Sequence, residues 1–140
     1  RLNIKPNFVA ILMQSHSLKK INTNITVDYK AAITKFIKDY FNQRMQLACT
    51  FVLIDSRHEP QKIDLEFMEF LGTNEIPFCI VFTKTDKLNK STLPKNIEHY
   101  KKELLETWEE LPPYFISSST TKAGQDEILD FIHKVNESLK

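Results

Sequence analysis

The sequence predicts an α/β protein, a three-layer α/β/α sandwich with a mostly parallel sheet. Two apolar runs rich in strand-forming residues, 47–55 and 76–82, are typical of parallel strands covered on both faces. Around these runs, apolar residues recur with the spacing of amphipathic helices. Strands that alternate with helices indicate βαβ units, and a chain of 140 residues, 41% of them hydrophobic, can bury one core.

The N-terminal third of the chain contains one ambiguous segment and one predicted helix. Residues 1–25 are left unassigned, with an apolar run at residues 8–13 that is a candidate strand and a polar stretch after it. From Thr26 to about Arg44, apolar residues fall at the i, i+3, i+4 and i+7 positions of one helix face. The domain is therefore assigned to residues 26–140.

The remaining elements alternate between helix and strand. A helix from about residue 61 is expected to end at Gly72, because glycine readily takes the left-handed conformation of a C-cap. Pro112 and Pro113 are expected to end a helix over residues 95–108. The other predicted elements are a short strand at 114–117, a loop at 118–124 and a closing helix from about 128 to 139.

Composition excludes several classes of protein. Nineteen basic against eighteen acidic residues give a net charge of +1, so no global field attracts nucleic acid or anionic membrane. No apolar run approaches the roughly 20 residues of a membrane span. Cys49 and Cys79 lie inside apolar runs and form no CxxC pair, which predicts a reduced, cytoplasmic compartment. The histidines have no metal-ligand spacing, so we assign no metal site and no catalytic residue.

Ligands of open parallel sheets bind at the carboxyl ends of the strands. Here one predicted strand is followed by Thr83-Lys84-Thr85-Asp86 and the next by Ser117-Ser118-Ser119. An aspartate carboxylate can accept hydrogen bonds from the N1–H and the exocyclic amine of guanine, whereas adenine has no donor at N1. Lys84 can lay its methylene stem on a purine face, and amides of the serine loop can meet the guanine carbonyl.

Each motif also has a simpler interpretation. A Lys-x-Asp sequence after a strand is often a helix cap with a solvated charge, and a serine-rich loop is ordinary turn chemistry. The order and the spacing of the two motifs, about thirty residues apart across a single predicted helix, favour guanine recognition.

The chain resembles the C-terminal part of the EngB (YihA/YsxC) family of GTP-binding proteins, in the TrmE-Era-EngA-EngB-septin class. The resemblance covers about residues 29–139. Its motifs are Ile54-Asp55-Ser56-Arg57-His58-Glu59-Pro60, then Asp64, Met68 and Leu71, then Thr83-Lys84-Thr85-Asp86-Lys87, Leu105-Glu106-Thr107-Trp108, and Ser118-Ser119 with Gly124.

The resemblance implies a partial P-loop GTPase domain that binds GTP or GDP. Thr83, Lys84 and Asp86 would form the guanine-specificity loop, with Thr83 where many GTPases have asparagine. Ser117, Ser118 and Ser119 would form the second base-contacting loop. The family uses magnesium, acts in assembly of the large ribosomal subunit and is linked to cell division and septum formation, which makes that subunit or its RNA an expected partner.

The phosphate-binding N-terminal part of such a domain is missing from the sequence. A GxxxxGKS/T loop and an Asp-x-x-Gly turn both need glycine, and no glycine precedes Gly72. A fragment, an upstream frame error or a divergent paralogue would each give this pattern. Hydrogen bonds to Asp86 contribute at best ~3 kcal/mol each, whereas association costs on the order of 4 kcal/mol or more. We therefore expect weak GTP binding and no hydrolysis.

Further expectations concern the alternative functions, three individual residues and the edge of the sheet. The alternatives to a GTP-binding protein are a nucleotide-independent ribosome-interaction module, a truncated remnant, and an unrelated flavodoxin-like enzyme. Asp55 is expected to be a structural partner of Arg57, His58 a hydrogen-bonded surface residue, and Trp108 a core residue of its helix. Because the missing phosphate-loop strand is central in such sheets, an exposed apolar sheet edge is also expected.

Overall fold

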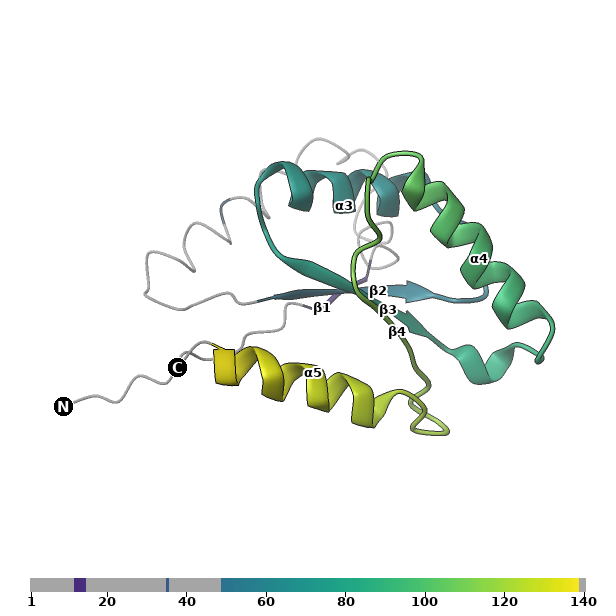
Figure 1. The fold of residues 1–140 in the computed structure, drawn as a ribbon. Helices are drawn as coiled ribbons and strands as arrows, with labels where there is room; N and C mark the ends of the chain where they lie inside the picture. The colour runs from purple at the N-terminus through teal and green to yellow at the C-terminus, as the bar shows by residue number, and fades with distance from the viewer. Residues whose placement is uncertain (1–11, 15–34, 36–48, 139–140) are drawn as a thin grey trace.

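The computed structural model describes residues 12–14, 35 and 49–138. Four parallel strands form one sheet in the order β1-β2-β3-β4 (Figure 1). The strands are β1 (Leu12–Gln14), β2 (Thr50–Asp55), β3 (Phe78–Thr83) and β4 (Tyr114–Ile116), and the helices are α3 (Lys62–Thr73), the 3-10 turn η1 (Thr85–Lys87), α4 (Thr92–Leu105) and α5 (Gln125–Ser138).

Helices cover both faces of the sheet, which confirms the predicted α/β/α layers. Figure 1 shows α3 and α4 above the strands and α5 below them. Successive side chains of β2 point to opposite faces. Val52 therefore packs with α3 and α4, whereas Phe51 packs with Phe131 of α5. Because helices cover both faces of the sheet, β2 and β3 carry apolar side chains on both faces. This explains the continuous apolar runs in the sequence.

Among the described residues, the core under α3 and α4 is the larger of the two. Phe67, Met68 and Leu71 of α3 and Leu104 of α4 are buried against β2 and β3. The ring of Phe82 contacts the ring of Tyr100 edge to face, with 5.3 Å between centroids. The second cluster, below the sheet, contains Cys49, Phe51, Cys79 and Val81.

Helix α4 differs from its predicted boundaries at both ends. The side-chain oxygen of Asn89 accepts hydrogen bonds from the backbone N–H groups of Ser91 and Thr92, at 3.1 and 2.7 Å, so the helix begins before residue 95. Pro94 lies in the first turn, where a missing N–H is tolerated. The helix ends at Leu105, so the prediction that Trp108 belongs to it was wrong.

Gly72 is not the C-cap of α3, contrary to the prediction. The helix continues to Thr73 and is capped at Asn74. The following residue, Glu75, takes the left-handed conformation with φ 57°, and Ile76 donates its backbone N–H to the carbonyl of Leu71 at 2.9 Å. This is a Schellman-type ending in which a glutamate occupies the position that usually holds glycine.

A short strand lies along part of one edge of β2. Strand β1 pairs in parallel with β2, with Leu12 opposite Phe51 and Gln14 opposite Leu53. The candidate strand at residues 8–13 thus overlaps β1 by two residues, and its other residues lie outside the described part of the chain, as does most of the predicted helix over 26–44. Within the described residues, no helix has both the length and the apolar character needed to cross a membrane.

Candidate functional site

The loops after β2, β3 and β4 meet at one edge of the sheet because the strands are parallel and in close register. Asp55, the last residue of β2, pairs with Thr83, the last residue of β3. Phe82 in turn pairs with Ile116 at the end of β4. The side chains that follow these strands are therefore neighbours, as the sequence predicted from the carboxyl ends of a parallel sheet.

The loop after β3 begins with a sharp turn at Lys84. Thr83 closes the strand by donating its hydroxyl to the carbonyl of Ile54 at 3.3 Å. Lys84 then adopts φ 59° and ψ 32°, the left-handed region that is costly for residues with a Cβ. Its carbonyl accepts the N–H of Lys87 at 3.0 Å, which closes η1. This turn places Asp86 beside the next loop.

The serine loop is fastened to β3 and to η1 through Ser117. The backbone N–H and the hydroxyl of Ser117 both donate to the carbonyl of Phe82, at 2.8 and 3.0 Å. The carbonyl of Ser117 accepts the N–H and the hydroxyl of Thr85, at 3.3 and 2.9 Å. Ser117 and Thr85 therefore hold the two loops together as a pair.

Asp86 and Ser118 make a direct contact between the side chains of the two predicted motifs. The Ser118 hydroxyl, in a residue that is 3% exposed, donates to Oδ1 of Asp86 at 2.7 Å. The same hydroxyl accepts the N–H of Thr121 at 3.2 Å. An aspartate is ionised at neutral pH, and the hydrogen bond from Ser118 lowers the pKa of Asp86 further. Its other oxygen, Oδ2, lies 3.8 Å from Nζ of Lys87.

Asp55 is the structural partner of Arg57, as predicted. Its carboxylate accepts the backbone N–H of Arg57 at 3.0 Å and forms a two-point contact with the guanidinium, the closer distance being 2.7 Å. Burial acts to raise the pKa of Asp55, but the hydrogen bonds from Arg57 outweigh it and lower the pKa to about 2. Nε2 of His58 lies 3.6 Å from the same carboxylate.

Lys84 connects this ion pair to the guanine-type loop. Its ammonium lies 3.6 Å from Oδ2 of Asp55, while the side chain as a whole remains 54% exposed. The methylene stem thus runs along the surface between the loops after β2 and β3. In the described residues, no group of three or more histidine, cysteine, aspartate or glutamate side chains could hold a metal ion.

The structure brings most of the predicted site residues together and separates one of them. Thr83, Lys84, Asp86, Ser117 and Ser118 all take part in the contacts between the loops. Ser119 is exposed beyond them. Its backbone N–H has no backbone partner within the region that the structure covers.

Sequence reasoning missed the role of Gly124 in shaping the serine loop. Gly124 has φ +78°, and a Cβ at this position would overlap with the carbonyl oxygen of Ile116. The N–H of Ser118 donates to the carbonyl of Ala123 at 3.1 Å, which closes the loop just before this glycine. The available signal was composition: the chain has only two glycines, so each was a candidate for a position that excludes other residues.

Comparison with known proteins identifies relatives of this chain. No family model matches the chain. It is 59% identical over 110 residues to the probable GTP-binding protein EngB of Christiangramia forsetii, covering 79% of this chain and 56% of the relative. This stretch is homologous to EngB. The corresponding EngB protein of Porphyromonas gingivalis is 57% identical over 110 residues, with coverage of 79% and 55%.

A solved structure has the same fold as this chain. The crystal structure of a probable GTP-binding protein EngB matches with a TM-score of 0.61 and 19% identity, over 78% of this chain and 65% of that one. At this identity the match shows the fold alone. The sequence comparisons confirm the resemblance to EngB. The chain spans about half the length of the curated relatives that it matches, which fits their C-terminal part.

Proposed function

We propose that the edge formed by the loops after β3 and β4 binds the base of a guanine nucleotide, GTP or GDP. The observation that carries this proposal is the 2.7 Å hydrogen bond between Ser118 and Asp86, which joins two motifs 32 residues apart. The names of the relatives, probable GTP-binding proteins, support the same assignment. We also propose that residues 26–140 are the C-terminal part of an EngB-type G domain.

Asp86 is the residue that would select guanine. An ionised carboxylate only accepts hydrogen bonds, and guanine presents two adjacent donors on its Watson–Crick edge. Asp86 is in this acceptor state at neutral pH, and its lowered pKa extends that state to more acidic conditions. The bond from Ser118 fixes one oxygen and leaves it a further lone pair, so the carboxylate is oriented before the base arrives.

The neighbouring residues would position the purine ring. The stem of Lys84 would cover one face of the base while Asp55 holds its ammonium. The amides of Ser117 and Ser118 already donate to Phe82 and Ala123. We therefore assign the contact with the guanine carbonyl to the backbone N–H of Ser119. Thr83 acts indirectly, because its hydroxyl ties the end of β3 to β2.

The binding is expected to be weak in this chain, because base contacts alone offset little more than the cost of association. Without a glycine before Gly72 there is no phosphate loop in the sequence, so we expect no GTP hydrolysis. The described carboxylates also do not fit a magnesium site, since Asp55 is engaged by Arg57 and Asp86 by Ser118. No step of the proposed function depends on magnesium.

The broader roles follow from the EngB resemblance alone. We propose that the longer protein of this type acts in the cytoplasm, binds magnesium together with the nucleotide, and takes part in large ribosomal subunit assembly, with a link to cell division and septum formation. A contact with the large subunit or its RNA belongs to this proposal. These roles rest on family resemblance and not on the geometry of the site.

The test is a titration of the chain with a fluorescent GDP analogue, with and without magnesium, followed by competition with unlabelled nucleotides. Asp86→Ala should abolish the signal. Asp86→Asn should reverse the preference from GDP to xanthosine diphosphate, because xanthine has a carbonyl in place of the guanine amine and an asparagine amide can donate to it. Asp126→Asn, which removes an exposed carboxylate from α5, is the matched control.

Two results of this titration would contradict the proposed guanine site. Binding that persists in Asp86→Ala would assign the nucleotide to another site. Absence of binding by the folded wild-type chain up to millimolar GDP would reject nucleotide binding by this chain and favour a nucleotide-independent interaction module.

A further inference from the structure

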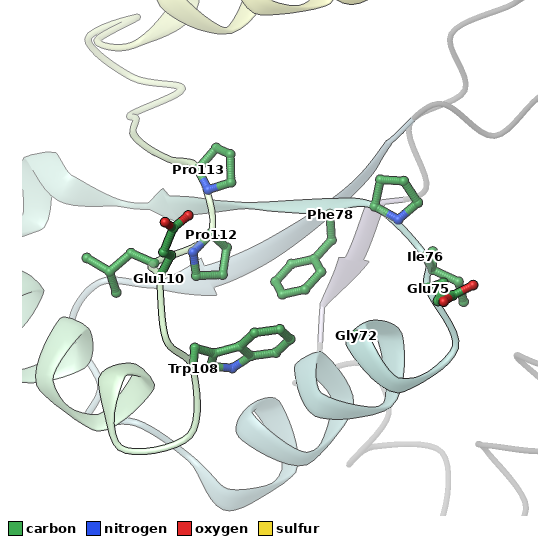
Figure 2. A pocket seen from close by; sticks show the side chains of 10 residues that line it. Gly72, Glu75, Ile76, Phe78, Trp108, Glu110, Pro112 and Pro113 are labelled. Atoms are coloured by element: carbon green, nitrogen blue, oxygen red, sulfur yellow. The ribbon is translucent and has the colours of Figure 1, made fainter.

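A groove of about 380 Å³ lies at the opposite end of the sheet from the candidate nucleotide site, where β3 and β4 begin. Its floor and walls come from the end of α3, the start of β3 and the segment between α4 and β4 (Figure 2). The apolar lining includes Ile76, Phe78, Trp108 and Pro112, and Glu75 and Glu110 also line the groove.

The aromatic wall of the groove is held in a fixed orientation. The ring of Trp108 meets Phe78 edge to face, with 5.5 Å between centroids and 65° between planes, and Figure 2 shows the two rings side by side. The far edge of the indole rests on Gly72, where a Cβ would overlap with Cη2 of Trp108. One of only two glycines in the chain thus lies in a helix to make room for this ring.

The two charged residues that line the groove are both acidic. Glu75 and Glu110 are exposed, and none of the residues that line the groove is a lysine or arginine. This is a local excess of negative charge in a chain whose net charge is +1. Glu75 also holds the left-handed conformation at φ 57°, a costly position for glutamate that glycine would occupy without strain.

We propose that this groove is a docking site for a cationic polypeptide segment of a partner protein, one that alternates lysine or arginine with apolar residues. Apolar side chains and lysine stems would cover the half-buried rings of Phe78 and Trp108, and the cationic groups would meet Glu75 and Glu110. The face of a tryptophan is also the best aromatic acceptor for a cation. Phosphate-bearing nucleic acid is disfavoured because the same carboxylates would repel it.

The test uses the fact that Trp108 is the only tryptophan in the chain, so its fluorescence reports on the groove directly. A hexapeptide of alternating lysine and leucine, with blocked ends, is titrated into the chain. We expect a saturable change in Trp108 emission. A glutamate-leucine peptide of the same length should give none, and affinity for the lysine-leucine peptide should fall as the salt concentration rises beyond physiological ionic strength.

Two double variants provide the decisive comparison. Glu75→Gln with Glu110→Gln keeps the shape of the rim and removes two charges, and should weaken peptide binding roughly five- to tenfold. Asp126→Asn with Glu127→Gln removes two exposed charges from α5, on the other face of the sheet, and should leave binding unchanged.

Several results would overturn the proposal. Equal weakening in both double variants would assign the effect to net charge, and equal binding of the glutamate-leucine peptide would remove charge recognition. No change in emission up to millimolar lysine-leucine peptide, in a chain with a native circular dichroism spectrum, would reject the site. So would a shift in Trp108 emission that depends only on protein concentration, or one produced by single-stranded RNA in place of the peptide.

Discussion

The hydroxyl of Ser118 donates a 2.7 Å hydrogen bond to Oδ1 of Asp86, and this bond is the direct side-chain link between the loops that follow β3 and β4. Ser118 is buried and also accepts the N–H of Thr121. It therefore fixes its own loop and the orientation of the Asp86 carboxylate at the same time. The orientation of the Asp86 carboxylate depends on this hydroxyl, whereas Ser117 and Thr85 also hold the two loops together.

Ser118→Ala is predicted to raise the pKa of Asp86 toward the ordinary aspartate value, since the bond from Ser118 is the largest cause of the lowered pKa. A lowered pKa contributes stability above the pKa of the unfolded chain, about 3.9, which is lost as the pH falls through the folded value. This acid-dependent contribution should shrink in the variant. Carbon-13 NMR titration of the Asp86 carboxyl in both proteins is the measurement, and an unchanged pKa would contradict the prediction.

Arg57→Gln is predicted to raise the pKa of Asp55 from about 2 toward its ordinary value, because burial acts to raise it and the side-chain hydrogen bonds and charge of Arg57 no longer oppose that effect. In the wild-type chain, the stability due to Asp55 is present above about pH 4 and is lost as the pH falls toward 2. Urea midpoints measured between pH 2 and 5 should therefore fall less steeply with acid in the variant. Lys62→Gln, which removes an exposed cation of α3, is the control that should keep the wild-type slope.

Gly124→Ala is predicted to destabilise the chain by about 2 kcal/mol or more, because an L-residue in the left-handed region is strained and the new Cβ meets the carbonyl of Ile116. Lys122 also has a positive φ, 63°, but carries a side chain. Lys122→Gly should therefore be neutral or stabilising by up to about 1 kcal/mol. Urea unfolding measures both effects, and equal destabilisation by the two changes would argue against the conformational explanation.

The layers and the main contacts of the site could be predicted from the sequence, because they depend on periodicity and chain direction. Continuous apolar runs gave buried strands, and parallel strands brought Asp86 near Ser118 through their carboxyl ends. The partnership of Asp55 with Arg57 followed from two opposite charges in one turn. In each case the physical cause lies within a short segment or in the order of segments.

The remaining features depend on contacts between distant segments, which spacing does not encode. A glycine after an apolar helical pattern is typical of a C-cap. Gly72 instead contacts Trp108, which lies 36 residues further along the chain. The start of α4 was misplaced because it depends on hydrogen bonds from Ser91 and Thr92 to the side chain of Asn89, and not on an apolar pattern. The pairing of β1 with β2 is likewise a tertiary contact, and three residues carry too little pattern to predict it.

The contact between Gly72 and Trp108 predicts that Gly72→Ala destabilises the chain, although replacing glycine by alanine within a helix usually stabilises it. Alanine normally stabilises a helix relative to glycine by about 1 kcal/mol. Here the added Cβ overlaps with the indole of Trp108, so Gly72→Ala must displace that ring from Phe78. We predict that Gly72→Ala destabilises the chain by about 1 to 3 kcal/mol, the range of an overpacked contact.

The same substitution should become stabilising where the ring is absent. In a Trp108→Leu background the shorter side chain does not reach Gly72, so Gly72→Ala should recover up to about 1 kcal/mol of helix propensity. Urea unfolding followed by far-ultraviolet circular dichroism measures the free energy of unfolding of the wild-type chain, the two single variants and the double variant. This measurement does not rely on tryptophan emission. If Gly72→Ala stabilises the wild-type chain, the glycine is not needed to make room for the indole ring. Contact with Gly72 then does not fix the position of Trp108 in the groove.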